Sequence, residues 1–397
     1  MTSLITRRTS LKQIALVAAA SALPTVVGSL SSLAFGNESQ PTPSEAELAS
    51  MDELARLFMS RYEVPGLSVA IARHGQFVYR KAFGWANQDA GERATPSSLF
   101  RIASVSKPIT SVTIFTLIEK NRLNLNDFVF GRNGILGFDY GSSYPDRVQR
   151  ITIEHLLMHT CGGWPNDDAD LMFFDNDISQ ADLIKSAVHE EPLQYEPGAH
   201  WAYSNFGYCI LGRVVEKLSR QTYEQYVQQN VLAKCGVTDM RIARNSLAER
   251  APGEVVYYAG HEVDPYAFNV RRMDSHGGWI ATPSDLVQVA MHVDGFSYTP
   301  NILEESTIRT MTEPCPISPE PHYAKGWFVG ANSWWHAGGL FGTASTLLRE
   351  ANGLCWAAIV NIRDPGIPEA LDRLMWDMVT VVPEWHAGSD SKLLRPR

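Results

Sequence analysis

The chain has 397 residues and a formal net charge of −9 at pH 7, with 45% hydrophobic and 19% charged residues. This composition is typical of folded globular proteins, and the length suits one large domain or two ordinary ones. The acidic balance and the lack of a long basic run argue against a nucleic-acid partner.

The first 36 residues are interpreted as a twin-arginine signal peptide. Arg7, Arg8 and Lys12 form a basic head without acidic residues, and a moderately apolar stretch follows it, as in such export signals. An ordinary secretory signal or an uncleaved anchor is the alternative. We expect an exported protein, periplasmic or secreted, with a polar linker over residues 37–44. No later stretch is long and apolar enough to cross a membrane, so no stable span is expected after signal removal.

The folded domain, predicted for residues 45–385 with a tail over 386–397, begins with a helix. Ser44 and Glu47 have the spacing of a capping box, which favours a helix from there to about residue 62. Two strands and a second helix are then predicted, at residues 66–73, 76–84 and about 104–120. The strands are joined by the pair His74-Gly75, which is typical of a two-residue hairpin turn.

The middle and the last third of the chain differ in their hydrophobic patterns. Residues from about 140 to 250 are rich in apolar-periodic helical runs, at 151–160, 204–220 and 222–236. The last third returns to strands, at 325–331, 333–338, 343–350 and 354–362, before a helix over 368–380. Hairpin-like connections favour antiparallel pairing. We therefore expect an α+β fold: an antiparallel sheet of about five strands flanked by helices, with a mainly helical lobe between its N- and C-terminal strands.

Ser104 and Lys107 stand three residues apart where the second helix is predicted to begin, so one helical turn places them on the same face. A serine hydroxyl is a poor nucleophile and needs a neighbouring base. A lysine can be that base when burial or a cationic neighbour lowers its pKa. The free N–H groups at a helix N-terminus also favour a developing negative charge. Taken alone, the pair is equally consistent with an ordinary polar first turn.

Two later segments carry further candidate groups. Tyr203 and Asn205 precede a predicted helix; a phenol near a lysine can relay a proton, and an amide can both donate to and accept from a substrate amide. His336 and the glycines 338 and 339 end a predicted strand, where bare backbone can bind an extended substrate at the sheet edge. Each group alone has a structural explanation, as a core aromatic, a helix cap or a turn residue.

Together, the segments SVSK (104–107), YSN (203–205) and HAG (336–338) resemble, in order and separation, the three motifs of the serine β-lactamase and penicillin-binding-protein superfamily, class C type. That group includes esterases, D-aminopeptidases and D-alanyl-D-alanine peptidases. The similarity extends over roughly residues 45–380 and includes ITIEHLLMHTCGG and HGGWIATPSDLVQVA. It implies a β-lactamase/transpeptidase-like fold. It also implies a serine hydrolase that forms an acyl-enzyme with small ester, amide or peptide substrates and needs no cofactor.

The resemblance implies catalytic roles for three side chains. Ser104 would be the acylated nucleophile, Lys107 would lower the barrier to its deprotonation, and Tyr203 would act as the general base. The backbone N–H groups of Ser104 and Gly339 would form the oxyanion hole.

Substrate-binding roles are implied for Asn205, which would orient the substrate, and for His336, Gly338 and Gly339 at the strand edge. The third motif of the familiar β-lactamases begins with a lysine, whose charge helps to hold a substrate carboxylate. Here the residue is His336, which is largely neutral near pH 7 unless perturbed. We therefore expect esters or D-amino-acid amides to be preferred over β-lactams.

Two other functions are consistent with parts of the sequence. His155 and His159 have the i, i+4 spacing that can chelate zinc, but Leu156 stands where a zinc peptidase has its glutamate, so no metal site is predicted. A catalytically silent penicillin-binding-type ligand-binding protein is the main alternative, although all three motifs keep chemically competent residues.

Other residues were given mainly structural interpretations. The five cysteines (161, 209, 235, 315 and 355) are scattered and do not indicate a disulfide framework. The aromatic-rich stretches 172–175, 255–260 and 327–335 either line an apolar acyl pocket or belong to the core.

Overall fold

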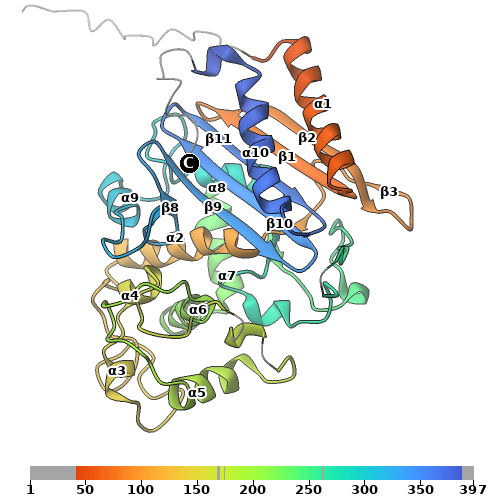
Figure 1. Cartoon of the computed structure of the whole chain (residues 1–397). Coiled ribbons are helices and arrows are strands. Elements are labelled where there is room, and N and C mark those ends of the chain that lie inside the picture. Colours follow the sequence, from red (N-terminus) through yellow and green to blue (C-terminus); the bar gives the residue numbers. More distant parts are fainter. Residues whose placement is uncertain (1–41, 168–169, 174, 262, 387–397) are drawn as a thin grey trace, which may run out of the picture. The chain divides into compact units, whose positions relative to one another are not determined.

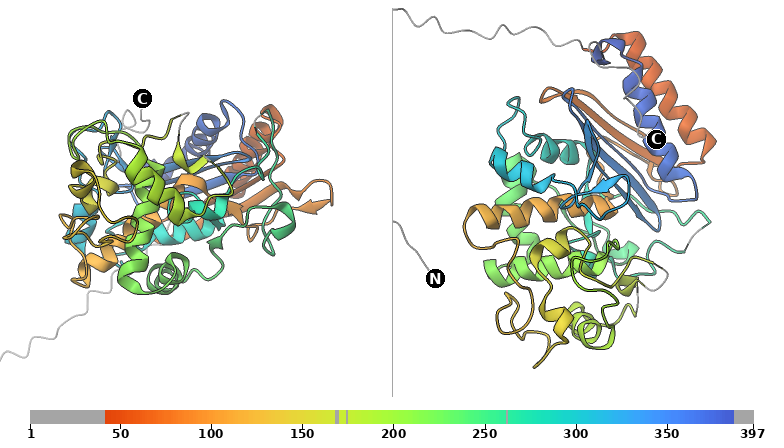
Figure 2. Two further views of the ribbon diagram at one scale, coloured as in Figure 1. Left: turned by 90° about the horizontal axis from the view of Figure 1, so that it is seen from below. Right: turned by 60° about the vertical axis from the view of Figure 1, so that its left-hand side comes forward.

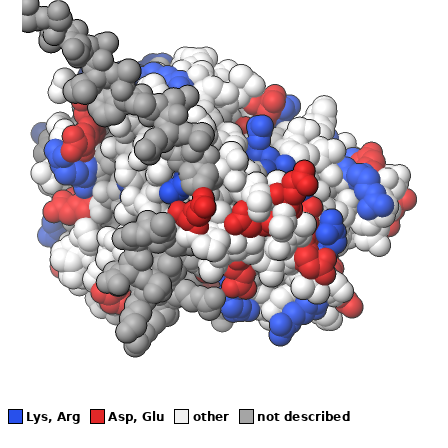
Figure 3. Space-filling view, turned by 90° about the horizontal axis from the view of Figure 1, so that it is seen from above, with Lys and Arg blue, Asp and Glu red and all other residues white. Residues whose placement is uncertain are grey.

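The structure is a computed structural model, and it describes residues 42–167, 170–173, 175–261 and 263–386 (Figure 1). The predicted signal peptide, most of the linker and all of the tail beyond residue 386 lie outside the described residues. Within the described part, no helix combines the length and the apolar character that a membrane crossing requires. On the face seen in Figure 3, basic and acidic side chains are interspersed.

The main sheet has eight strands in the order β3-β2-β1-β11-β10-β9-β8-β7, all paired antiparallel. The strands are β1 (Gly66–Arg73), β2 (Gln76–Asn87), β3 (Glu92–Arg93), β7 (His322–Tyr323), β8 (Phe328–Val329), β9 (Ser333–Leu340), β10 (Thr343–Glu350) and β11 (Leu354–Val360). The early strands thus pair directly with the late ones, as predicted. The five long strands lie where the sequence indicated strands, β8 lies within a sixth predicted strand, and β3 and β7 stand at the two edges of the sheet.

Helices cover both faces of this sheet (Figure 2). The helices of the described residues are α1 (Glu45–Arg61), α2 (Ser106–Glu119), α3 (Asp146–Gln149), α4 (Ile153–Leu157), α5 (Gln180–Glu190), α6 (Asn205–Ser219), α7 (Tyr223–Val227), α8 (Pro283–Met291), α9 (Glu305–Met311) and α10 (Ile367–Thr380), and α3 to α6 lie in a helical lobe beside the sheet (Figure 1). Helices α1 and α10 pack against one face, and α8 packs against the other. Consequently β11 is buried on both sides: Trp356 and Ala358 join the core under α10, whereas Cys355 and Ala357 join the larger core.

Local signals explain several boundaries. The Ser44–Glu47 capping box forms at the start of α1. In the hairpin between β1 and β2, His74 has φ 48° and Gly75 has φ 77°, the left-handed pair that a two-residue turn requires. All five cysteines are buried and free.

Three elements are shorter than predicted, and the first is the helical run expected over 151–160, which is reduced to α4. The expected helix over 222–236 is regular only in α7; a π turn and a 3₁₀ turn continue it to residue 235, and it ends at Gly236 with φ 71°. The strand expected over 325–331 is reduced to β8, because Gly326 turns with φ 94° and packs so closely on α2 that a Cβ there would lie 2.5 Å from Ser111 Cβ. A small second sheet, β4-β6-β5 (Phe100–Arg101, Trp279–Ala281, Arg241–Ile242), was not predicted.

Candidate active site

Ser104 lies in a 3₁₀ turn, Ala103–Val105, immediately before α2 begins at Ser106. Lys107 and Pro108 are therefore in the first turn of α2, where the missing proline N–H costs no hydrogen bond. Helix α2 is buried on all sides from Ser106 to Leu117, which is typical of a helix at the centre of a fold. The predicted helix start is confirmed to within two residues, with the nucleophile candidate just outside the regular helix.

The backbone before Ser104 is strained in a way that aims its N–H. Ala103 has φ 47°, a left-handed conformation that is costly for a residue with a Cβ. The preceding carbonyl of Ile102 is held by the Ser345 hydroxyl at 2.7 Å. A Cβ on Gly338 would lie 2.3 Å from that carbonyl oxygen and 3.1 Å from Ser104 N. Only a glycine therefore lets β9 approach this closely, and the next residue, Gly339, is exposed and lines the same cavity as Ser104.

Lys107 is fully buried and surrounded by three oxygen atoms. Its Nζ lies 3.0 Å from Ser104 Oγ, 2.7 Å from Asn205 Oδ1 and 3.1 Å from the carbonyl oxygen of His276. Burial lowers the pKa of Lys107 to about 7, against a partial opposing effect from the negative charge of Asp170. A substantial fraction of this amine is therefore neutral near pH 7.

Tyr203 and Asn205 reach Ser104 from the start of α6. The Tyr203 hydroxyl is hydrogen-bonded to the Ser104 side chain, and its ring centroid lies 4.7 Å from Lys107 Nζ. The enclosed position raises the pKa of the phenol. Asn205 accepts from Lys107 and donates through Nδ2 to Asp170 Oδ2 at 2.6 Å and to Asn166 Oδ1 at 2.9 Å. The structure thus brings the first two motifs into one hydrogen-bonded group.

His336 lies behind this group rather than in the cavity wall. It is 1% exposed, its Nδ1 lies 2.7 Å from the carbonyl oxygen of Ala337, and its Nε2 lies 3.4 Å from the Tyr323 hydroxyl. Burial, and secondarily the charge of Lys107, lower the pKa of His336 to about 3. The imidazole is therefore neutral, and it is not among the residues that line the cavity at Ser104.

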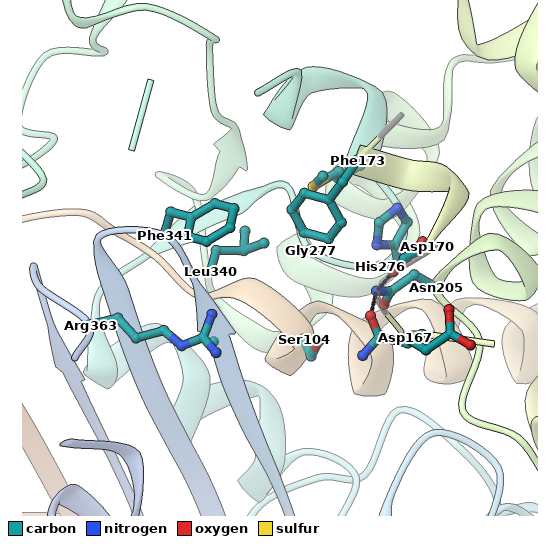
Figure 4. Close-up of a pocket in the computed structure, with 13 residues that line it drawn as sticks. Ser104, Asp167, Asp170, Phe173, Asn205, His276, Gly277, Leu340, Phe341 and Arg363 are labelled. Carbon is teal, nitrogen blue, oxygen red and sulfur yellow. Dashed lines mark hydrogen bonds between the residues drawn. The ribbon is translucent and has the colours of Figure 1, made fainter. Parts of the chain in front are cut away.

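That cavity has a volume of about 430 Å³ (Figure 4). It is lined by Ser104, Asn166, Asp167, Asp170, Phe173, Asn205, Met273, His276, Gly277, Gly339, Leu340, Phe341 and Arg363. The sequence interpretation named Ser104, Asn205 and Gly339 of these. It assigned no role to the acidic pair, His276 or Arg363, which stand on loops; the signals for them were the short acidic run at 167–170 and the segment HGGWIATPSDLVQVA, which begins with His276.

Aromatic rings wall one side of the cavity. Phe173 and Phe341, which line it, lie 5.9 Å apart between ring centroids, and Phe268 packs 5.9 Å from the first and 5.7 Å from the second. The stretches 255–260 and 327–335 contribute mainly to the core, as the near-complete burial of Tyr257 and Trp327 shows. Of the three aromatic-rich stretches, only 172–175 reaches the cavity.

The two histidines of the zinc alternative have other contacts. His155 Nδ1 accepts from the backbone N–H of Thr152 in a helix cap, and His159 Nδ1 accepts from the N–H of Ser204. Among the described residues, no group of three or more His, Cys, Asp or Glu side chains is arranged to hold a metal ion.

Comparisons with curated proteins find relatives that are similar over much of the chain. Protein flp of Staphylococcus aureus strain N315 is 24% identical over 83% of this chain, which spans 66% of that relative's length. Penicillin-binding protein 4* of Bacillus subtilis strain 168 is 31% identical over 48% of this chain and 40% of that protein.

Solved structures share the fold. The D-amino acid amidase from Ochrobactrum anthropi SV3, complexed with L-phenylalanine amide, has a TM-score of 0.69 and 20% identity over 84% of this chain and 99% of that chain. EstCE1, described as a hydrolase with promiscuous acyltransferase activity, has a TM-score of 0.66 and 18% identity over 84% of this chain and 98% of that chain. A family model described as Beta-lactamase matches residues 51–379. The chain therefore belongs to the beta-lactamase family.

Proposed function

We propose that the protein is a serine hydrolase that cleaves small esters or amides through an acyl-enzyme on Ser104. The observation that carries the proposal is the 3.0 Å contact between Ser104 Oγ and a fully buried Lys107 whose pKa is lowered to about 7. A base poised near the working pH is what a serine nucleophile needs.

The contacts of Lys107 suit the neutral amine. A neutral amine has two N–H bonds and one lone pair. The N–H bonds are directed to Asn205 Oδ1 and the His276 carbonyl, which leaves the lone pair for the Ser104 hydroxyl. Lys107 takes the hydroxyl proton as Oγ attacks the substrate carbonyl carbon, and the N–H groups of Ser104 and Gly339 bind the resulting oxyanion.

Tyr203 is assigned to proton delivery. The resemblance implied that it is the base, but its raised pKa makes the phenolate scarce at neutral pH, so Lys107 is the better acceptor. When the tetrahedral intermediate collapses, the bond to the leaving group breaks and the leaving group takes the hydroxyl proton of Tyr203. Lys107 then returns the proton that it took from Ser104 to the Tyr203 oxygen. Water then attacks the acyl-enzyme by the same route, releasing the acid and restoring Ser104.

Esters and amides are favoured over β-lactams as substrates. The neutral, buried His336 offers no cation for a β-lactam carboxylate at the third motif, so such a carboxylate would have to reach Arg363 at the cavity's other end. The fold neighbours described as an amidase and as a hydrolase support the same ordering. A kcat/KM for a penicillin a hundredfold above that for short esters would reverse it.

The first experiment is stopped-flow hydrolysis of p-nitrophenyl butyrate by the purified protein and by Ser104→Ala. We expect an initial burst followed by steady turnover, with a butyryl adduct on Ser104 in the intact mass. Equal rates in the two proteins would refute catalysis at Ser104. Penicillin labelling of Ser104 without any turnover would instead support the silent ligand-binding alternative.

We also propose export through the predicted signal peptide, on the strength of Arg7 and Arg8. Cell fractionation should place the protein outside the cytoplasm. The variant in which lysine replaces both arginines should instead stay in the cytoplasm. Export of the double-lysine variant through the general secretory route would contradict the twin-arginine assignment.

A further inference from the structure

The cavity at Ser104 has two differently charged ends (Figure 4). In the close-up, Ser104 lies between Arg363 on one side and Asp167 on the other, with Asp170 beside Asn205. A carboxylate group on a ligand is repelled from the acidic end and attracted to the other. The reacting carbonyl must lie near Ser104. The acidic end and the Arg363 end of the cavity therefore bind the two different parts of the substrate on either side of that carbonyl.

His276 is an independent sign that the acidic end receives a ligand. Its side chain is 2% exposed and lines the cavity, yet neither ring nitrogen has a hydrogen-bond partner among the described residues; Nε2 is entirely buried. Burial and the charges of Lys107, Arg272 and Arg213 keep the imidazole neutral. A buried, unsatisfied polar group is costly, and a ligand group that hydrogen-bonds the imidazole would offset this cost.

Asp170 is fixed but retains capacity to accept. It is 5% exposed; Oδ1 accepts from the Met172 N–H at 2.9 Å, and Oδ2 accepts from Asn205 at 2.6 Å. Each carboxylate oxygen can accept more than one hydrogen bond. Asp167, which is exposed, adds a second carboxylate to the same end. Two carboxylates at one end of the cavity suit a ligand group with several N–H bonds.

The geometry points to an ammonium subsite formed by Asp167, Asp170 and His276, which selects acyl donors that carry a free α-amine. This inference rests on the proposed hydrolysis at Ser104. Phe173 stands next to His276, and Phe341 packs against it on the side of Arg363 (Figure 4), so the side chain of the acyl donor is apolar. The substrates are therefore esters, amides or short peptides of an apolar α-amino acid with an unblocked N-terminus.

The kinetic test compares D- and L-phenylalanine p-nitroanilide with the p-nitroanilide of 3-phenylpropionic acid, which lacks only the amine. The ammonium group also makes the neighbouring carbonyl intrinsically more reactive, and this effect is the same in every variant. The readout is therefore the kcat/KM of the amine substrate divided by the kcat/KM of the deaminated substrate, compared between variants. Asp167→Asn and His276→Phe should each lower this ratio by about five- to tenfold. Asp89→Asn, which removes the same charge from the exposed turn between β2 and β3, should leave it unchanged. An unchanged ratio in both test variants would overturn the subsite.

The binding test is independent of turnover. Calorimetric titration of Ser104→Ala with D- and L-phenylalaninol and with 3-phenyl-1-propanol should give at least about tenfold tighter binding for one amine enantiomer. Adding Asp167→Asn should remove most of this preference. Equal affinity for the amine and the plain alcohol would refute the subsite, even if Ser104-dependent hydrolysis is found. An amine preference in binding without Ser104-dependent hydrolysis would refute the proposed function and keep the subsite.

Discussion

The pH dependence of hydrolysis tests the assignment of Lys107 as the base. Its pKa is lowered from 10.5 to about 7 by burial, which corresponds to about 5 kcal/mol. Because only the neutral amine accepts the Ser104 proton, kcat/KM should rise about tenfold per pH unit below pH 7 and level off above about pH 8. An exposed lysine would instead give a rise that continues towards pH 10.

The assay is kcat/KM for p-nitrophenyl butyrate from pH 5 to 10 at constant ionic strength, read where p-nitrophenol and its anion absorb equally. Tyr203→Phe separates the two candidate bases. It should lower the plateau by roughly 10- to 100-fold yet keep the break near pH 7, because Lys107 still titrates. Lys107→Met should lose most activity and show no break. A break that survives in Lys107→Met, or one that disappears in Tyr203→Phe, would refute the lysine assignment.

Three further predictions concern the third motif. Gly338→Ala should lower the free energy of unfolding in urea by about 2 kcal/mol or more, because its Cβ would lie 2.3 Å from the Ile102 carbonyl oxygen and from Ser345 Oγ. Gly339→Ala should change the free energy of unfolding by less than about 1 kcal/mol, because the atom nearest to the new Cβ is Nε of the flexible Arg363 side chain, at 3.3 Å. Equal losses in the two alanine variants would contradict this geometry. His336→Lys would place a second cation beside Lys107, so thermal unfolding should show that the free energy of unfolding falls by about 3 kcal/mol or more. Penicillin hydrolysis should not become faster. A stable variant with faster penicillin hydrolysis would show that His336 is not buried. His336 stays neutral in the folded state to about pH 3, whereas the unfolded chain protonates it below about 6.5. Its contribution therefore makes the unfolding free energy decrease as pH falls from about 6.5 to about 3, and His336→Gln should have a shallower slope by about one proton; an unchanged slope would contradict the neutral imidazole.

Much of the fold could be predicted because its signals are local. The Ser44–Glu47 box and the His74-Gly75 turn fix a helix start and a hairpin through contacts between near neighbours. The strands at 343–350 and 354–362 are long, and a turn that contains Gly353 joins them. The shortening of the strand at 325–331 was not predictable, because it follows from the packing of Gly326 on α2, more than 200 residues earlier in the chain.

The site could be predicted only where a motif marks it. Ser104, Lys107, Tyr203 and Asn205 do lie in one hydrogen-bonded group. The segment HGGWIATPSDLVQVA marks His276 only through the resemblance, because a lone histidine beside two glycines has no spacing that indicates a cavity. The burial of His336 was equally invisible, since it depends on the packing of Tyr323 and Tyr203 around it.

The chemistry of the pair Ser104 and Lys107 is therefore a property of the whole fold rather than of its spacing. The oxygens that receive the Lys107 N–H bonds are 98 and 169 residues away along the chain. These contacts and the surrounding core exclude water, and this exclusion brings the pKa of the amine near 7. The same Ser-x-x-Lys pattern on an exposed helix would keep an ordinary lysine, charged and unable to accept a proton. Any substitution that lets water reach Lys107, even far from Ser104, should therefore shift the break of the pH profile upward before it alters substrate binding.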